Sequence, residues 1–299
     1  MKPSRREFSL GALSLGGAVL AGCSSASRST RPLPASASDA AQDGSRFWLA
    51  HNRELVAQFE LAPNANILDA GCGRGDHALL LAERAPLGRV TALDISQDVI
   101  SALRARIAGT PFERRVAPQV GDLQALQFAT ASFDAAWTSH VLHFMPDPVA
   151  CVRELARVVR PGGLVVVRED RALTRCLPLD VGLSEPGLEE RVNASFEAWF
   201  AADRTQRGRV SMGWLGVLRA GGLHDVRAKS VLMELTPPFA HHQARHLRRG
   251  LEREANDERL SSADRAALRE LSTEGGAHDA LARNDLHFVS VSSLYLGRV

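Results

Sequence analysis

The chain has 299 residues, 45% of them hydrophobic and 23% charged, which is typical of a globular protein with a large core. The charges of its 36 basic and 34 acidic residues nearly cancel, to a formal net charge of +2. The chain therefore lacks the basic excess expected of a nucleic-acid-binding protein. The four cysteines show no C-x-x-C spacing and indicate neither a disulfide framework nor a zinc site, so we expect no bound metal.

Residues 1–23 have the layout of an export signal, with basic residues followed by a short apolar segment. Residues 4–8, SRREF, resemble a twin-arginine signal, and residues 20–23, LAGC, resemble a bacterial lipobox. We therefore expect an exported lipoprotein that faces the periplasm or the cell exterior, with a membrane tether through Cys23. The alternative is a cytoplasmic protein with a chance apolar leader.

Residues 24–44 are rich in serine and alanine and contain two prolines, a composition typical of a disordered tether. We expect one large domain over residues 45–299. Its first element is a helix over residues 46–60, where apolar residues recur at helical spacing.

From residue 67 onward, apolar runs of strand length alternate with helical segments. Such alternation is typical of βαβ units, which form a parallel sheet with right-handed crossovers. The predicted strands cover 67–70, 90–94, 116–120, 133–138 and 164–168, and the predicted helices between them cover 76–85, 96–107 and 146–159.

After residue 170 the alternation ends. We expect helices over 185–203 and 211–220, strands over 226–235 and 288–296, and two further helices, 240–256 and 261–275, between these strands. About fifty residues separate the two strands, more than a hairpin needs. We therefore expect an insertion, at about 237–285, that forms a lid over the site.

The turn after the first strand carries Gly71, Gly73 and Gly75 at every second position. The dinucleotide fingerprint G-x-G-x-x-G would have its third glycine at position 76, where Asp76 would instead repel a pyrophosphate. No G-K-S or G-K-T follows, so the sequence also lacks a phosphate-binding P-loop. The turn therefore indicates a ligand without phosphate at this position and disfavours a nicotinamide-dependent oxidoreductase.

Acidic residues accompany the ends of three predicted strands. Asp69 lies at the end of the first, Asp94 ends the second, 19 residues after Gly75 (94 − 75), and Asp122 follows the third. An acid at this distance from the glycines is well placed to bind ribose hydroxyls. Because ligands of open α/β sheets bind beyond the carboxyl ends of the strands, we expect these acids and Thr138 to gather at one site.

Four motifs in this order resemble the class I S-adenosylmethionine-dependent methyltransferases, and among them the small-molecule group that includes ubiquinone and menaquinone methyltransferases. The motifs are ILDAGCGRG, ALDIS, residues 120–148 and residues 154–170, and they cover about half the chain. The resemblance implies a Rossmann-like, doubly wound sheet of seven strands, mostly parallel with an antiparallel last strand. It also implies S-adenosylmethionine as the cofactor.

The resemblance further implies roles for single residues. Asp94 would bind both ribose hydroxyls, and Asp122, with the backbone amide of Leu123, would bind the adenine ring edge. Ile95 would pack on the adenine ring. Asp69 would position the amino-acid part of the cofactor, satisfy backbone amides of the glycine turn, or do both.

Residues 138–140 lie where the family has groups that face the sulfonium and the acceptor. Methyl transfer is an in-line displacement with a neutral leaving group, so positioning and desolvation are the main requirements. A hydroxyl acceptor would also need a general base, and His140 and His143 are the candidates because histidine titrates near neutral pH. The alternative is that one of them is a structural histidine bonded to a backbone carbonyl.

We therefore expect methyl transfer to a small apolar acceptor. The rival hypothesis is an exported binding protein that keeps this fold without turnover, because S-adenosylmethionine made in the cytoplasm would not be renewed outside it. His242 and His246 lie four residues apart on one helix but lack the glutamate of an H-E-x-x-H zinc motif. We expect them on a lid face or a solvated helix face.

Overall fold

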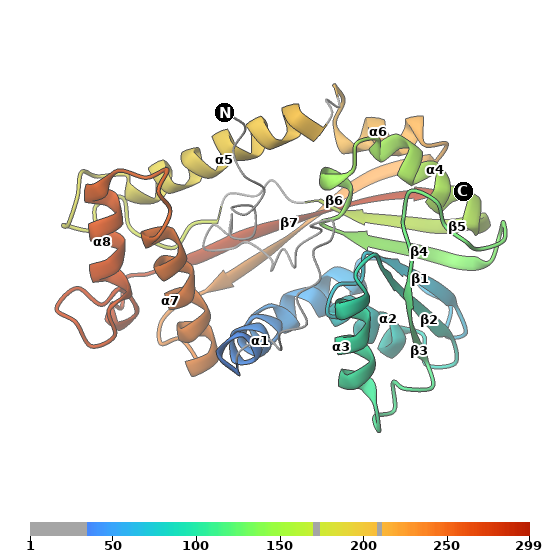
Figure 1. Cartoon of the computed structure of the whole chain (residues 1–299), viewed down its shortest axis with the longest axis horizontal. Helices are drawn as coiled ribbons and strands as arrows, with labels where there is room; N and C mark the ends of the chain where they lie inside the picture. The colour runs from blue at the N-terminus through green and yellow to red at the C-terminus, as the bar shows by residue number, and fades with distance from the viewer. Residues whose placement is uncertain (1–34, 170–173, 208–210) are drawn as a thin grey trace. The chain divides into compact units, whose positions relative to one another are not determined.

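The computed structural model describes residues 35–169, 174–207 and 211–299 (Figure 1). The predicted export signal, with Cys23, and residues 24–34 lie outside the described residues. Among the residues that are described, no helix is both long and apolar enough to cross a bilayer.

Seven strands form one sheet, in the order β3-β2-β1-β4-β5-β7-β6. Strands β1 to β5 pair in parallel, and β7 runs antiparallel to β5. This confirms the predicted doubly wound, mostly parallel sheet with an antiparallel last strand. The bounds are β1 (Asn66–Ala70), β2 (Arg89–Asp94), β3 (Val116–Val120), β4 (Phe133–Ser139), β5 (Val159–Arg168), β6 (His224–Leu235) and β7 (Phe288–Arg298).

Side-chain caps begin several of the helices. Ser96 accepts a hydrogen bond from the Val99 amide, and Asp147 accepts one from the Ala150 amide, which satisfies backbone donors that the first turn leaves open. The helices are α1 (Ala35–Ala57), α2 (Asp76–Arg84), α3 (Gln97–Ile107), η1 (Leu142–Phe144), α4 (Pro148–Val158), α5 (Leu188–Arg207), α6 (Trp214–Ala220), α7 (His241–Ala255), α8 (Ser262–Ser272) and η2 (Ala280–Ala282).

The chain divides into two compact units, where the sequence predicted a single domain over residues 45–299. The first, the helical unit, consists of the described parts of Met1–Leu49, Ala172–Asp203 and Leu232–Val291. The second, the sheet unit, consists of the described parts of Ala50–Arg171, Arg204–Val231 and Ser292–Val299. Each unit draws on three separate stretches of chain, and local sequence patterns carry no information about such long-range association.

The helical unit has a hydrophobic core of its own, which includes Phe47, Leu188, Leu247, Leu268 and Phe288. Helices α7 and α8 and the short η2 come between β6 and β7 in the chain, at the position of the predicted insertion. They share their core with α5 and with the middle of α1, at Phe47 and Trp48, which the predicted bounds of 237–285 did not include. The role of the insertion as a lid stays a prediction.

Helix α1 begins at Ala35, so the structure describes residues 35–44 as helical, where composition predicted a disordered tether. Asp43 is 1% exposed, and its carboxylate accepts hydrogen bonds from Arg245 at 2.6 Å and Arg249 at 2.7 Å. Burial alone would raise the pKa of Asp43, but the two guanidinium groups lower it. These partners lie 202 and 206 positions away, beyond the reach of local composition.

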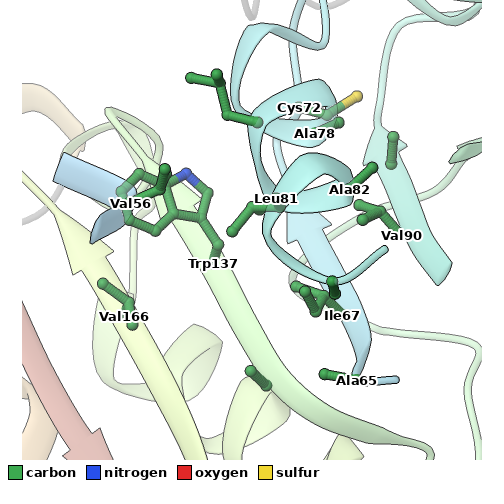
Figure 2. Close-up of a cluster of buried hydrophobic side chains, with 14 of the residues drawn as sticks. Val56, Ala65, Ile67, Cys72, Ala78, Leu81, Ala82, Val90, Trp137 and Val166 are labelled. Carbon is green, nitrogen blue, oxygen red and sulfur yellow. The ribbon is translucent and has the colours of Figure 1, made fainter. Parts of the chain in front are cut away.

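The sheet unit has a hydrophobic cluster on each face of its sheet. Helices α2 and α3 pack on one face, through residues such as Leu81 and Leu103, and α4 and α6 pack on the other (Figure 1). Figure 2 shows Trp137 of β4 among the side chains of Val56 and Leu81 in the first cluster. Because dense packing holds the strands on both faces, the residues at their carboxyl ends have a rigid base.

Candidate functional site

The turn after β1 needs its glycines for two different reasons. Gly71, Gly73 and Gly75 have φ angles of 77°, 51° and 84°, which glycine adopts without a steric penalty. A Cβ atom at Gly71 would also clash with Val141, and one at Gly75 would clash with Leu103. A Cβ atom at Gly73 would meet nothing within 4 Å. Open space therefore lies against the middle of the turn.

Asp94, at the end of β2, is held between the glycine turn and the start of α3. Its Oδ2 accepts a hydrogen bond from the Gly73 amide at 3.0 Å, and its Oδ1 accepts one from the Ser96 amide at 2.9 Å. Each carboxylate oxygen has a second lone pair that can accept another hydrogen bond. This geometry suits two adjacent hydroxyl donors. The next residue, Ile95, is 55% exposed and offers an apolar surface beside them.

Asp69, at the end of β1, is 1% exposed, and its Oδ2 has no hydrogen-bond partner among the residues that the structure describes. Burial, and next the negative charge of Asp94, raise the pKa of Asp69 to about 8, against a hydrogen bond from the Ala78 backbone that lowers it. A buried carboxyl oxygen without a partner is costly. A cationic group beside Asp69 would remove that cost.

Thr138 is fully buried at the end of β4, directly beside β1, where it lies opposite Ala70 in the strand register. Its hydroxyl oxygen has no hydrogen-bond partner within the described part of the chain. Two orphaned polar atoms, on Asp69 and Thr138, thus belong to the ends of neighbouring strands.

Asp122 follows β3, and the neighbouring Gly121 amide donates to the Asp94 carbonyl at 3.0 Å. Asp122 Oδ1 accepts a hydrogen bond from the Gln124 amide at 2.8 Å, so this carboxylate stabilises a turn. The Leu123 side chain is buried in the cluster that α4 and α6 cover. The predicted contacts of Asp122 and Leu123 with adenine stay predictions.

The sheet order brings the predicted cofactor residues to one edge. Strands β3, β2, β1 and β4 are consecutive neighbours in the sheet. The carboxyl end of each lies at, or within two residues of, one predicted residue: Asp122 for β3, Asp94 for β2, Asp69 for β1 and Thr138 for β4. The chain turns back between β1 and β4, which makes this edge the topological switch point where open α/β sheets bind ligands.

The two candidate histidines follow β4. His140 has a φ angle of 56°, unusual for a residue with a side chain, and its amide donates to the Arg168 carbonyl at 2.9 Å. This left-handed residue turns the chain from β4 into η1, which contains His143. The two imidazole rings are 6.2 Å apart and nearly perpendicular.

Glu169 is a site residue that the sequence analysis missed. It follows β5, is 2% exposed, and bonds the ring Nδ1 of His143 through Oε2 at 2.5 Å. Its Oε1 accepts hydrogen bonds from the amides of Val141 at 3.1 Å and Leu142 at 2.7 Å. The signal was present in the sequence, since Glu169 is an acid directly after the predicted strand 164–168, much as Asp122 follows the predicted strand 116–120.

Arg204 was also missed. It belongs to the sheet unit, at the end of α5, and its Nη1 donates to the carbonyls of His143 at 2.6 Å and Met145 at 3.0 Å. Nothing in the amphipathic pattern of α5 marks this residue. The η1 turn is thus held by a carboxylate at its amino end and by a guanidinium at its carboxyl end.

His246 is buried in the core of the helical unit, where the sequence suggested a lid face or a solvated face. Its ring stacks on Phe47 at a centroid distance of 4.2 Å. Burial, assisted by the charges of Arg253 and Arg249, lowers the pKa of His246 to about 4. Across the described ranges, no cluster of three or more histidine, cysteine or acidic residues could hold a metal ion.

Known proteins match the same part of the chain that carries these residues. The methyltransferase domain family matches residues 68–167. The demethylmenaquinone methyltransferase of Symbiobacterium thermophilum is 33% identical over 123 residues, 41% of this chain and 49% of that protein. The ubiquinone/menaquinone biosynthesis C-methyltransferase of Geotalea daltonii is 32% identical over 125 residues, 42% of this chain and 52% of that protein. The chain spans about half the length of these curated relatives.

Among solved structures, the phosphoethanolamine N-methyltransferase 2 of Haemonchus contortus, in complex with S-adenosyl-L-methionine, has a TM-score of 0.49 and 17% identity. The likeness covers 87% of this chain and 57% of that one.

The matched region runs from β1 to β5 and contains the glycine turn, Asp69, Asp94 and the η1 turn. The helical unit falls wholly outside it. The order of motifs predicted from the sequence, the sheet order and the family match agree, and they identify residues 68–167 as a methyltransferase domain of the class I, S-adenosylmethionine-dependent type.

Proposed function

We propose that the sheet unit binds S-adenosylmethionine and directs the transfer of its methyl group to a small apolar acceptor by in-line displacement. The observation that carries the proposal is the Asp94 carboxylate, held by the Gly73 and Ser96 amides at the switch point of the sheet. When bound, S-adenosylmethionine supplies an electrophilic methyl group on a positively charged sulfur.

The residues present suit each part of this cofactor. Both Asp94 oxygens retain acceptor capacity for the two ribose hydroxyls. The exposed side chain of Ile95 offers an apolar face to the adenine ring. Asp69, whose buried Oδ2 has no partner within the described residues, would accept the α-ammonium group. The open space at Gly73 allows the ligand to approach the backbone closely.

For the chemical step, the protein's main contribution is geometric. A sulfonium loses its charge as the methyl group leaves, so the transition state needs alignment and exclusion of water more than a new countercharge. Thr138 and the η1 turn with His143 lie at the same edge of the sheet as Asp69, and so border the place where acceptor and methyl group would meet.

The preference for a small apolar acceptor rests on the relatives. The proteins from Symbiobacterium thermophilum and Geotalea daltonii are named as quinone-pathway methyltransferases. The helical unit lies outside the family match.

The cofactor assignment predicts the behaviour of one substitution. In the full chain, we expect Asp94→Ala to weaken S-adenosylmethionine binding by about 100-fold or more, since two hydrogen bonds to a charged group are lost at roughly 1.5–3 kcal/mol each. Isothermal titration calorimetry with S-adenosylmethionine and S-adenosylhomocysteine measures this.

Asp134→Asn is the matched control. Asp134 also accepts a backbone amide hydrogen bond, from Asn66 at 2.7 Å, but it lies near the start of β4, away from the carboxyl ends of the strands. We expect unchanged affinity for this variant. Absence of binding by the wild-type chain would refute the proposed function, and equal binding by wild type and Asp94→Ala would refute the ribose assignment.

The rival hypothesis, a binding protein without turnover, is decided by the product. Incubation of the full chain with S-adenosylmethionine and a panel of small aromatic acceptors should yield S-adenosylhomocysteine together with a methylated compound, both detected by mass spectrometry. Tight cofactor binding with no methylated product across the panel would favour the rival.

We also propose that the chain is exported and anchored through Cys23. Residues 20–23, LAGC, and residues 4–8, SRREF, support this. Expression of the full chain in a bacterial host should give a membrane-fraction protein that begins at a lipidated Cys23, as seen by mass spectrometry of the N-terminal peptide. A Cys23→Ser variant should leave the membrane fraction. A soluble wild-type protein that retains Met1 would contradict the proposal.

A further inference from the structure

We propose that Glu169 is a positioning residue that holds His143 as the general base of the transfer, and that the acceptor is therefore a hydroxyl compound such as a phenol. This inference rests on the proposed function and assigns it a substrate class.

The first support is the location of the η1 turn. A Cβ atom at Gly71 would clash with the Val141 side chain, so the glycine turn and the residue before η1 are in direct contact. The backbone that carries His143 is therefore packed against the turn that we assign to the cofactor. A group on η1 is close to any ligand seated on that turn.

The second support is the bonding of the imidazole. The 2.5 Å contact between Glu169 Oε2 and His143 Nδ1 joins two buried side chains, 2% and 9% exposed. A carboxylate can only accept, so the imidazole must carry its proton on Nδ1 when it is neutral. The lone pair then belongs to Nε2. This is the tautomer that a base acting through Nε2 requires.

The third support is the rigidity of the turn. At the amino end of η1, Glu169 Oε1 accepts hydrogen bonds from the amides of Val141 and Leu142. At its carboxyl end, Arg204 donates hydrogen bonds to the carbonyls of His143 and Met145. The same carboxylate thus orients both the backbone and the ring of His143. A base that is held in this way loses little entropy when the acceptor arrives.

The pair of Glu169 and His143, the dyad, indicates which class of acceptor is used. A neutral hydroxyl is a weak nucleophile, and its proton must leave as the new bond forms. The acceptor oxygen bonds to the methyl carbon, the electron pair of the carbon–sulfur bond stays on sulfur, and the hydroxyl proton passes to His143 Nε2. The imidazolium that results is stabilised by Glu169, and it returns the proton to solvent after the product leaves. Thiols and amines have less need of such a base.

The experiment compares the full-length wild type with Glu169→Gln, Glu169→Asp and His143→Asn, using phenol, 4-nitrophenol, thiophenol and benzylamine as acceptors. We expect the wild type to methylate the phenols. With phenol, Glu169→Gln should lower kcat about 100-fold or more, with KM and cofactor affinity nearly unchanged, because general-base catalysis contributes about 10²–10⁴-fold. Glu169→Asp should recover part of the rate, and Asp134→Asn should behave as wild type.

Two further readouts separate positioning from a merely structural role. The loss in Glu169→Gln should be much smaller with 4-nitrophenol, which is ionised near pH 8 without help. Nitrogen-15 NMR of the imidazole should show the Nδ1–H tautomer in the wild type and its loss in Glu169→Gln. For the pH profile of kcat, the charged or titratable groups around His143 include Glu169 and His140 near its ring and Arg204 at its backbone carbonyl. The His140→Gln variant tests whether His140 contributes to this profile, and its kcat should depend on pH in the same way as that of the wild type.

Each outcome has one meaning. An equal loss of rate with both phenols, or an unchanged tautomer in Glu169→Gln, would overturn the role of Glu169. Turnover of thiophenol or benzylamine without turnover of either phenol would overturn the substrate class. Cofactor binding without turnover of any acceptor would instead favour the binding protein without turnover and so refute the proposed methyl transfer. A wild type that fails to bind S-adenosylmethionine would refute the proposed function instead, and the NMR result on the dyad would still stand.

Discussion

At the scale of the residue, three carboxylates of one site differ because their surroundings differ. Asp94 is bound by two backbone amides, Asp69 has a buried oxygen without a partner among the described residues, and Glu169 bonds an imidazole. An acid after a strand is visible in the sequence. Which of these tasks it performs depends on neighbours from other strands, and only the folded chain supplies them.

The buried Asp69 makes stability depend on pH. Its pKa is about 8 in the folded protein, and an unfolded aspartate titrates near 3.9, so between these values the folded state holds a proton that the unfolded state has released. Stability should therefore fall as pH rises through this window. From pH 5 to pH 8 we expect a loss on the order of 3 kcal/mol without cofactor.

Asp69→Asn should remove this slope, as measured by urea unfolding of both proteins at several pH values. Cofactor binding near pH 7 should release protons from the wild type only, because the α-ammonium group favours the ionised carboxylate. Calorimetry in buffers of different ionisation enthalpy detects that release. Parallel pH curves for wild type and variant would show that Asp69 is not the group responsible.

At the scale of the element, the predicted helices exist, but their predicted ends differ from the observed ones by a few residues. Helices predicted over 240–256 and 261–275 are observed as α7 (His241–Ala255) and α8 (Ser262–Ser272). The exception is α1, which starts at Ala35 instead of position 46. Serine and alanine are compatible with a helix when tertiary contacts support it, and here Asp43 supplies the contact.

The two bonds of Asp43 predict a measurable coupling between α1 and α7. Asp43→Asn should destabilise the helical unit by about 2–3 kcal/mol, since the variant leaves two guanidinium groups facing each other without a countercharge. Hydrogen exchange of α1 and α7 should become faster.

Glu190→Gln is the matched control for this prediction. Glu190 pairs with Arg175 in the same unit, but both side chains are more than 40% exposed, so its loss should cost at most about 1 kcal/mol. If Asp43→Asn costs no more than Glu190→Gln, then the Asp43 bonds do not hold the two helices together.

At the scale of the whole molecule, the start of the fold limits the reach of the proposed lipid anchor. From Cys23 to Ala35 there are 12 residue steps (35 − 23), which span at most about 40 Å whatever their conformation. The tether predicted from composition, ending at residue 44, would have allowed about 75 Å over 22 steps (45 − 23). An anchored molecule would therefore hold α1 close to the bilayer surface.

The sequence by itself determined the sheet, the glycine turn and the acids at the strand ends. These features are local, because strand period, glycine spacing and the residue that ends a strand are all read within a few positions. The tertiary structure decided the rest. The pairing of Glu169 with His143, the anchor that Arg204 gives to η1, and the two-unit division all join residues that are 26 or more positions apart, and no local pattern encodes which distant partner a side chain meets.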